Sequence, residues 1–407
     1  MLKILFIGLV WPEPSSSAAG WRILNLIKCF STLGQVFFVS AASKSIYSAD
    51  LREFGVQENS IFLNDSSFDE FVKNLLPEIV VFDRFMVEEQ YGWRVAENCP
   101  NALRILDTED LHFVRLARQD AYKKKTSIDY YSQTAKRELA SILRSDLSVI
   151  ISQTEMDLLS SQFNIPLEKL FYLPFQEEIL TEEHINQLPT YDERLNFMFI
   201  GNFIHEPNFR TVEVLKKEIW PILRKKCPTA ELHIYGAYAS EKVLQLNNPK
   251  ERFYIKGRAE DARNTLSTYR VLMAPIPFGA GAKGKFVDAM AAGTPSITTS
   301  IGAESMTVEY WNGFIEDDKE VFIEKAVLLY SDEAIWSAKQ QMGFELFNET
   351  VADNSYTAHM LALVKDYVNN LDKLRKKNFF GEILLQQQVN ATKYMSLWIE
   401  EKNKKAH

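Results

Sequence analysis

The stretch FGAGAKGKFVDAMAAG, residues 278–293, combines residue types that could bind an anion. Gly279 and Gly281 allow backbone N–H groups to approach a ligand closely, and the helix expected from about Lys285 presents its positive end to negative charge. Lys283 and Lys285 add mobile positive charge. A diphosphate stays anionic at neutral pH and needs several donors at once, so this order of parts predicts a diphosphate site.

Asp288 follows Lys285 by about one helical turn on the same helix face. In this arrangement the cation could bind the phosphate of a ligand and the carboxylate could bind the ribose hydroxyls of the same ligand. The alternative is that the glycine-rich turn only joins a strand to a helix, and that Lys285 and Asp288 form an i,i+3 pair on the surface.

The elements that would position this stretch form two series of alternating strands and helices. The first series contains apolar runs that begin at Lys3, Gln35, Glu78, Leu103, Leu147 and Phe171. Residues 180–195 are polar and contain proline, which indicates a linker, and the alternation then restarts at Asn196. The pattern predicts two doubly wound α/β domains with parallel sheets, whose ligands lie beyond the carboxyl ends of the strands.

Composition narrows the class of protein further. The net charge of −8 over 407 residues argues against a large nucleic-acid interface. Three scattered cysteines predict neither a disulfide framework nor a zinc site, and a reduced cytoplasmic compartment fits them best. We expect no metal. Basic clusters at 123–125 and 373–377 could meet anionic lipid, so we expect a soluble cytoplasmic protein with at most weak peripheral contact at the inner membrane face.

The segment 278–305 resembles the donor-binding segment of retaining GT-B glycosyltransferases of the family 4 type, glycosyl transferases group 1. FIGNFIHEPN (199–208) and IWPILRKKCPTAELHIYG (219–236) resemble other parts of that family's second domain, in the same order. ILDTEDLHFVRLAR and ELASILRSDLSVIISQTE resemble late first-domain segments of bacterial members. The likeness covers most of the chain from Met1 to about Lys365.

This resemblance implies a fold and an activity. The fold would be GT-B, with Rossmann-like domains at 1–185 and 192–370 facing a central cleft, and a helical segment at 371–407 packing back on the first domain. The activity would be transfer of a hexose-type sugar from a nucleotide diphosphate sugar, such as a UDP- or GDP-sugar, with retention of configuration. The acceptor, whether carbohydrate, lipid-linked or protein, stays open, and no cofactor is expected.

The resemblance also assigns roles residue by residue. Gly201 and Asn202 would lie beside the diphosphate, Lys285 would be its main cation, and Asp288 would take the ribose-binding place usually held by glutamate. The base would lie near Gly257 and Arg258. Gly20, in the first domain, would come close to the phosphates when the cleft closes.

Two positions depart from the family pattern. The family often has two glutamates eight positions apart, and counting back from Asp288 places Ala280 where the first would contact the donor sugar. Where many members have a histidine after the fifth first-domain strand, counting places Glu109, with Asp110 and His112 nearby. Of these three candidates for the catalytic place we favour Asp110 and His112; the alternative is that the segment DTED only caps the next helix.

Two further residues are candidates for donor contacts. His205 could reach the sugar or a phosphate from its loop, and Glu304 could accept from sugar or ribose hydroxyls at a strand's carboxyl end. Other classes of protein also fit this plan: a sugar-nucleotide epimerase, a pyridoxal-phosphate phosphorylase, and a catalytically silent nucleotide-sugar-binding protein. A nicotinamide dehydrogenase does not, because SSSAAG lacks the GxGxxG spacing.

Overall fold

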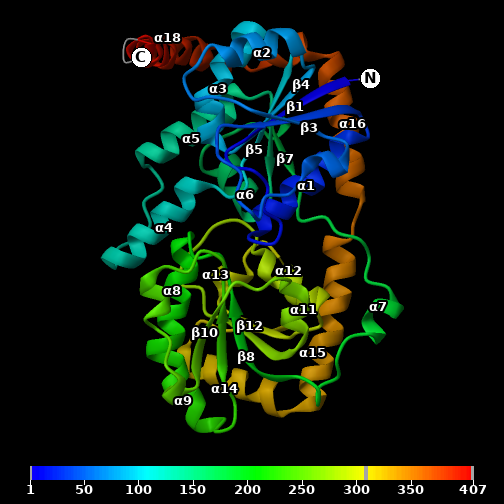
Figure 1. Ribbon diagram of the computed structural model, residues 1–407, viewed down its shortest axis with the longest axis vertical. Helices are drawn as coiled ribbons and strands as arrows, with labels where there is room; N and C mark the ends of the chain where they lie inside the picture. The colour runs from blue at the N-terminus through cyan, green and yellow to red at the C-terminus, as the bar shows by residue number, and fades with distance from the viewer. Residues whose placement is uncertain (1, 307–309, 405–407) are drawn as a thin grey trace.

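The computed structural model describes residues 2–306 and 310–404, and it contains two parallel sheets, one above the other in Figure 1. Residue 1 of the first predicted domain, residues 307–309 of the second and residues 405–407 of the predicted C-terminal segment lie outside the described residues. The predicted pair of doubly wound domains is confirmed.

The first sheet has seven parallel strands in the order β3-β2-β1-β4-β5-β6-β7. Their bounds are β1 Leu2–Gly8, β2 Gly34–Ser40, β3 Gln57–Ser60, β4 Ile79–Asp83, β5 Leu103–Asp107, β6 Leu147–Ile150 and β7 Leu170–Tyr172. The helices between them are α1 Ala18–Ser31, α2 Ser67–Leu75, α3 Phe85–Asn98, α4 His112–Lys124, α5 Gln133–Arg144 and α6 Gln153–Ser161. Strands such as β4 are buried along their whole length, because helices cover both faces of the sheet.

The second sheet has six parallel strands in the order β10-β9-β8-β11-β12-β13. Their bounds are β8 Leu195–Ile200, β9 Leu232–Tyr235, β10 Phe253–Gly257, β11 Tyr269–Ala274, β12 Ser296–Thr298 and β13 Gly313–Ile315. Its helices are α8 Glu206–Val214, α9 Trp220–Lys226, α10 Glu241–Leu244, α11 Ala262–Ser267, α12 Gly284–Ala291, α13 Ser300–Ala303, α14 Lys319–Ser331 and α15 Glu333–Leu346.

Two segments connect the domains. The polar stretch expected to be a linker contains the short helix α7, Glu182–Asn186. After α15 the chain returns to the first domain as α16 (Ser355–Asn369), α17 (Leu371–Lys377) and α18 (Phe379–Lys404), visible along the right edge and top of Figure 1. The crossing begins before the boundary expected at residue 370, because Met360 and Val364 of α16 are fully buried in the first domain's core beside Ile4 and Phe6.

None of the described helices combines the length and the apolar character needed to cross a bilayer.

Candidate functional site

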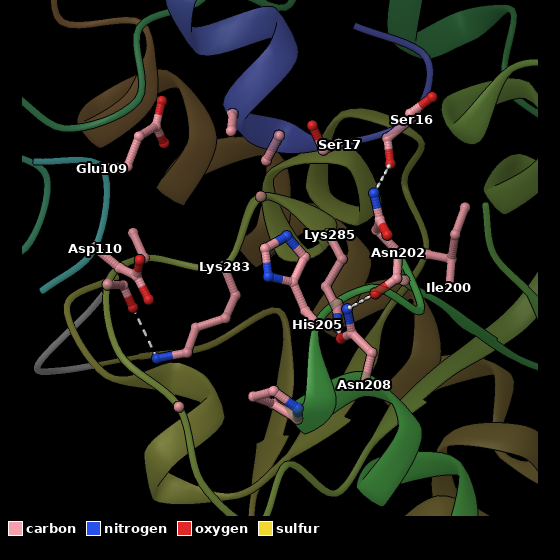
Figure 2. Close-up of a pocket in the computed structure, with 18 of the residues that line it drawn as sticks. Ser16, Ser17, Glu109, Asp110, Ile200, Asn202, His205, Asn208, Lys283 and Lys285 are labelled. Carbon is pink, nitrogen blue, oxygen red and sulfur yellow. Dashed lines mark hydrogen bonds between the residues drawn. The ribbon is translucent and has the colours of Figure 1, made fainter. Parts of the chain in front are cut away.

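A cavity of about 260 Å³ lies between the carboxyl ends of the two sheets. The first domain contributes the loop at 14–19 and the segment after β5, and the second contributes the loops after β8, β10 and β11 (Figure 2). Of the predicted site residues, those that line the cavity are Glu109, Asp110, His112, Gly201, Asn202, His205, Arg258, Gly279, Gly281, Lys283, Lys285 and Asp288. Gly20, Gly257 and Glu304 are not among its lining residues.

The helix α12 points its amino end at this cavity. It begins at Gly284, and the side chain of its N-cap residue, Lys283, accepts no hydrogen bond from its first turn. The first N–H groups of a helix have no partner within the helix, so they can donate to an anion. Gly284 is close to α1 as well, since a Cβ on Gly284 would lie 2.4 Å from the Ala18 Cβ atom.

Lys285, the second residue of α12, is a half-buried lysine with no carboxylate close by among the described residues. Its Nζ atom donates to Asn208 Oδ1 at 2.7 Å and lies 4.5 Å from the centre of the Phe199 ring. No ion pair with a carboxylate is found for Lys285 among the described residues. Burial, reinforced by the like charge of Lys283, lowers the pKa of Lys285 to about 7.

Lys283 reaches into the same space (Figure 2). Its Nζ atom donates to the Gly281 carbonyl at 2.7 Å and lies 3.9 Å from Glu304. Burial lowers the pKa of Lys283 to about 8, although Glu304 partly opposes that shift. A bound anion would restore the ordinary pKa of both lysines, so the site favours a ligand with several negative charges.

Asn208 positions Lys285, a role that was not predicted from the sequence. Besides accepting from Lys285, its amide donates to the Asn202 carbonyl at 2.8 Å. Gly201 makes room for it, because a Cβ at Gly201 would lie 2.6 Å from the Asn208 side chain. Gly201 therefore acts through packing, and the sequence signal that could have found Asn208 is its place at the end of FIGNFIHEPN.

Asp288 and Lys285 do not form the surface pair considered as the alternative. Asp288 Oδ1 instead accepts from Arg263 Nε at 2.9 Å, and Arg263 also bonds to Glu177 at 2.9 Å. Burial raises the pKa of Asp288, and the charge of Arg263 works against that rise. Asp288 still lines the cavity together with Lys285, so a carboxylate and an ammonium border the same space.

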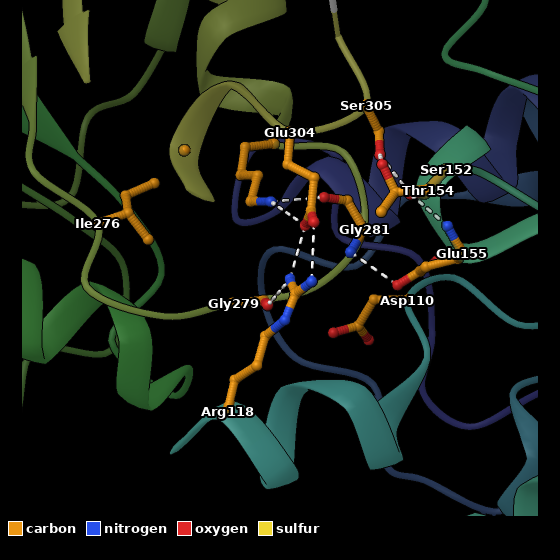
Figure 3. Close-up of polar contacts among 12 residues, drawn as sticks. Asp110, Arg118, Ser152, Thr154, Glu155, Ile276, Gly279, Gly281, Glu304 and Ser305 are labelled. Atoms are coloured by element: carbon orange, nitrogen blue, oxygen red, sulfur yellow. Dashed lines mark hydrogen bonds and ion pairs between the residues drawn. The ribbon is translucent and has the colours of Figure 1, made fainter. Parts of the chain in front are cut away.

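The glycine-rich turn itself bonds mainly to the first domain (Figure 3). Gly281 has φ +63°, a conformation that suits glycine, and its N–H donates to Glu155 Oε1 at 2.8 Å. The Gly279 carbonyl accepts from Arg118 at 2.8 Å. The expectation that the Gly281 N–H faces a ligand is therefore wrong for this conformation, because a buried carboxylate from α6 already binds it.

Glu304 also serves the contact between domains. Its two carboxylate oxygens accept from Arg118 of α4 at 2.6 and 2.8 Å. Arg118 binds both carboxylate oxygens and Glu304 lies outside the cavity lining, so the donor contact expected of Glu304 stays a prediction. Nearby, Ser305 Oγ donates to Thr154 Oγ1 at 3.1 Å and contacts Ser152 (Figure 3).

The first-domain loop 14–19 meets the second domain on the other side of the cavity. Arg258 donates to Ser16 Oγ at 2.7 Å and also to Ser15, and its guanidinium lies over the Tyr47 ring. Asn202 donates to the Ser16 carbonyl at 3.3 Å (Figure 2). These contacts place Asn202 and Arg258 against the loop 14–19 at one wall of the cavity.

Two glycines of this region act outside the cavity. Gly20 lets the loop fold against α1, since its Cβ would fall 2.2 Å from the Glu13 carbonyl oxygen. Gly257 supplies a φ of +76° immediately before Arg258. Both glycines shape the chain next to lining residues instead of contacting the cavity.

Glu109 is an unusual carboxyl group on the first-domain side of the cavity. It has a left-handed backbone, φ +58°, and only 8% of it is exposed. Its Oε1 atom is buried without a hydrogen-bond partner among the described residues. Burial, with the negative charge of Asp107, raises the pKa of Glu109 to about 8, so at neutral pH it can donate as well as accept a hydrogen bond.

Asp110 and His112, the two favoured candidates, are both engaged with their neighbours. Asp110 accepts from Arg115 Nε at 2.6 Å; burial opposes ionisation, but Arg115 keeps the pKa of Asp110 below its ordinary value. The Nδ1 atom of His112 lies 3.3 Å from the Asp110 carbonyl oxygen and 3.7 Å from Glu138. Glu138 also accepts from the first N–H groups of α4, so the helix is capped by Glu138 and not by the segment DTED.

His205 stands at the amino end of α8 without capping it, and its side chain lines the cavity. Desolvation inside the cleft lowers the pKa of His205, although the negative charge of Asp110 opposes this shift. The net lowering favours the neutral imidazole. Among the described residues no group of three or more His, Cys, Asp or Glu side chains is arranged to hold a metal ion.

Comparisons with known proteins agree with the two-domain fold. Residues 194–332 match the model of the family glycosyl transferases group 1. No curated protein matches the chain in sequence.

Solved structures match over most of the fold. TarM of S. aureus, solved as a mutant with fondaparinux, α-GlcNAc-glycerol and UDP, has a TM-score of 0.68 at 10% identity, over 89% of this chain and 100% of its own. Anabaena HepE with UDP and glucose has a TM-score of 0.62 at 12% identity, over 90% and 100%. Sucrose-phosphate synthase from Thermosynechococcus elongatus has a TM-score of 0.62 at 14% identity, over 90% and 99%.

The fold is that of the GT-B glycosyltransferases, and residues 194–332 match the family glycosyl transferases group 1, as the resemblance predicted. The family match falls on the second domain, which holds the glycine-rich segment, Lys283, Lys285 and Asp288.

Proposed function

We propose that this protein transfers a hexose-type sugar from a nucleotide diphosphate sugar to an acceptor, with retention of the anomeric configuration. The observation that carries the proposal is the pair Lys283 and Lys285 at the uncapped start of α12, inside the cavity between two Rossmann-like domains. Such a site stabilises the negative charge that develops on a departing diphosphate. UDP is the first nucleotide to test, because TarM and HepE were both solved with it.

The proposed step needs no strong base on the protein. The bond between the anomeric carbon and the diphosphate oxygen breaks, and the acceptor oxygen bonds to the same face of that carbon. The acceptor's proton passes to the departing phosphate oxygen. In this scheme Lys285, Lys283 and the α12 N–H groups stabilise the leaving diphosphate, Asp288 contacts the ribose, and Arg258 lies near the base.

We assign Glu109 to the sugar side of the site, in place of the histidine that the resemblance would put there. The carboxyl group lines the cavity, has one unpartnered oxygen and is largely protonated at neutral pH, so it can exchange hydrogen bonds with a sugar hydroxyl. Asp110 and His112 would position it and the adjoining loop, since both are already bonded to neighbours.

The test combines binding and turnover. Calorimetry with UDP, GDP and ADP should give binding to at least one nucleotide, and Lys285→Ala should weaken it while Lys225→Ala, an exposed lysine on α9, should not. Release of nucleotide from matching sugar nucleotides should depend on added acceptor, and the product's anomeric proton coupling should match that of the donor. Absence of any nucleotide binding would reject the proposal, and interconversion of free sugar nucleotides without release would indicate an epimerase.

A further inference from the structure

The last helix, α18, presents its aromatic side chains and some of its aliphatic side chains to solvent. Phe379, Phe380, Tyr394 and Trp398 are 68%, 78%, 66% and 61% exposed, and Ile383 and Leu397 are also exposed. At 3.6 residues per turn these six positions fall within an arc of about 100° on the helix, and Met395, 63% exposed, lies about 60° beyond its edge. They therefore form one stripe, which we call the α18 stripe, and not scattered surface residues.

The opposite side of α18 holds the helix to the first domain through polar contacts. Its buried described residues are Gly381, Ser396 and Glu400. Ser396 accepts from Arg94 Nη2 at 3.1 Å and donates to Asn64 at 2.9 Å, while Arg104 donates to Glu382 at 3.4 Å. A surface helix ordinarily turns its apolar stripe to the core, so this inverted arrangement indicates that the α18 stripe meets something outside the chain.

Charge around the stripe distinguishes between possible occupants. Residues 371–404 contain seven Lys or Arg and four Asp or Glu, a net charge of +3 in a chain of net charge −8. The exposed residues Lys373, Lys376 and Lys377 come shortly before Phe379 and Phe380. Lys402, also exposed, follows Trp398 by about one helical turn. Two copies joined by this face would bring like charges together, whereas an anionic bilayer surface complements them.

We propose that α18 docks the protein on the surface of an anionic phospholipid bilayer. The α18 stripe enters the boundary between headgroups and acyl chains, with Trp398 and Tyr394 at headgroup depth and the lysines on anionic headgroups. The helix lies across the end of the first domain farthest from the second domain (Figure 1), so docking holds the second domain away from the bilayer. This surface is separate from the cleft and does not depend on the proposed sugar transfer.

Flotation of the full chain with vesicles tests the proposal. We expect binding to vesicles of equal phosphatidylglycerol and phosphatidylcholine at 0.1 M ionic strength or below, and much weaker binding to phosphatidylcholine alone. The double variant Phe379→Ser, Phe380→Ser should lower the partition coefficient by about tenfold or more. The double variant Lys376→Gln, Lys377→Gln should lower it by about fivefold for each lysine.

The matched control is the pair Lys225→Gln, Lys226→Gln, two exposed lysines on α9 at the far end of the second domain, which should leave binding unchanged. All altered side chains are exposed, so thermal unfolding should stay at the wild-type temperature and confirm that each variant folds. Equal binding of Phe379→Ser, Phe380→Ser and wild type would overturn the proposal. The proposal would also be overturned if the wild type bound to neither vesicle and sedimentation equilibrium showed a dimer that these substitutions abolish.

Discussion

Replacing Lys285 by methionine removes the ammonium group while keeping most of the side chain's length over the Phe199 ring. A charge-assisted hydrogen bond to a phosphate contributes about 1.5–3 kcal/mol. Asn208 keeps its bond to the Asn202 carbonyl, so the site should not collapse. We therefore expect about 2 kcal/mol less binding free energy for UDP near pH 7, a loss of about thirtyfold in affinity.

The pH profile of the same measurement makes the test sharper. The pKa of Lys285 is lowered to about 7 in the empty cleft, and a bound diphosphate should raise it toward the ordinary value for lysine. Lys285 is already charged below pH 7, whereas above pH 7 the cleft takes up a proton as UDP binds. Wild-type affinity should therefore fall by up to about tenfold between pH 7 and about pH 8.

In Lys285→Met the decline should begin only near pH 8, where Lys283 titrates. Calorimetry in two buffers of different ionisation enthalpy measures the protons taken up directly, and Lys225→Met is the control. A flat wild-type profile between pH 7 and 9, or equal affinity of Lys285→Met and wild type at pH 7, would refute the assignment of Lys285 to the diphosphate.

Three further predictions concern other parts of the site. Gly201→Ala should displace Asn208, whose side chain a Cβ would approach to 2.6 Å, and should weaken UDP binding by about tenfold with little change in melting temperature. Glu109→Gln should lower turnover more than nucleotide affinity. It should also raise the melting temperature at pH 8 but not at pH 4.5. The raised pKa of Glu109 means that the folded state loses stability relative to the unfolded state as the pH rises from about 4.5 to 8. Arg118→Met should lower the free energy of unfolding by about 3 kcal/mol, and the double variant with Glu304→Gln should recover part of that loss; additive losses in the double-mutant cycle would contradict this pairing.

Several assignments of the sequence analysis changed for one physical reason. Asp288 bonds to Arg263 and Gly281 to Glu155, and neither partner is near in sequence. The residue types at the end of a strand follow from the local sequence. Which of those residues will form a hydrogen bond with a side chain far away in the sequence does not. The same holds for Glu304, which Arg118 of the other domain binds through both carboxylate oxygens.

The sequence by itself determined the two parallel α/β sheets and the position of the glycine-rich segment. Strand-helix alternation and the order of Gly281, Lys283 and Lys285 are local and periodic, so they survive without knowledge of any long-range contact. Only the tertiary structure decided that Asn208 holds Lys285, that Glu109 and not Asp110 has the unpartnered carboxyl oxygen, and that α18 turns its aromatic side outward. Those outcomes depend on which polar groups come into contact when the domains and the last helices pack together. Burial and neighbouring charges at those contacts then determine the hydrogen-bond partners and the pKa values.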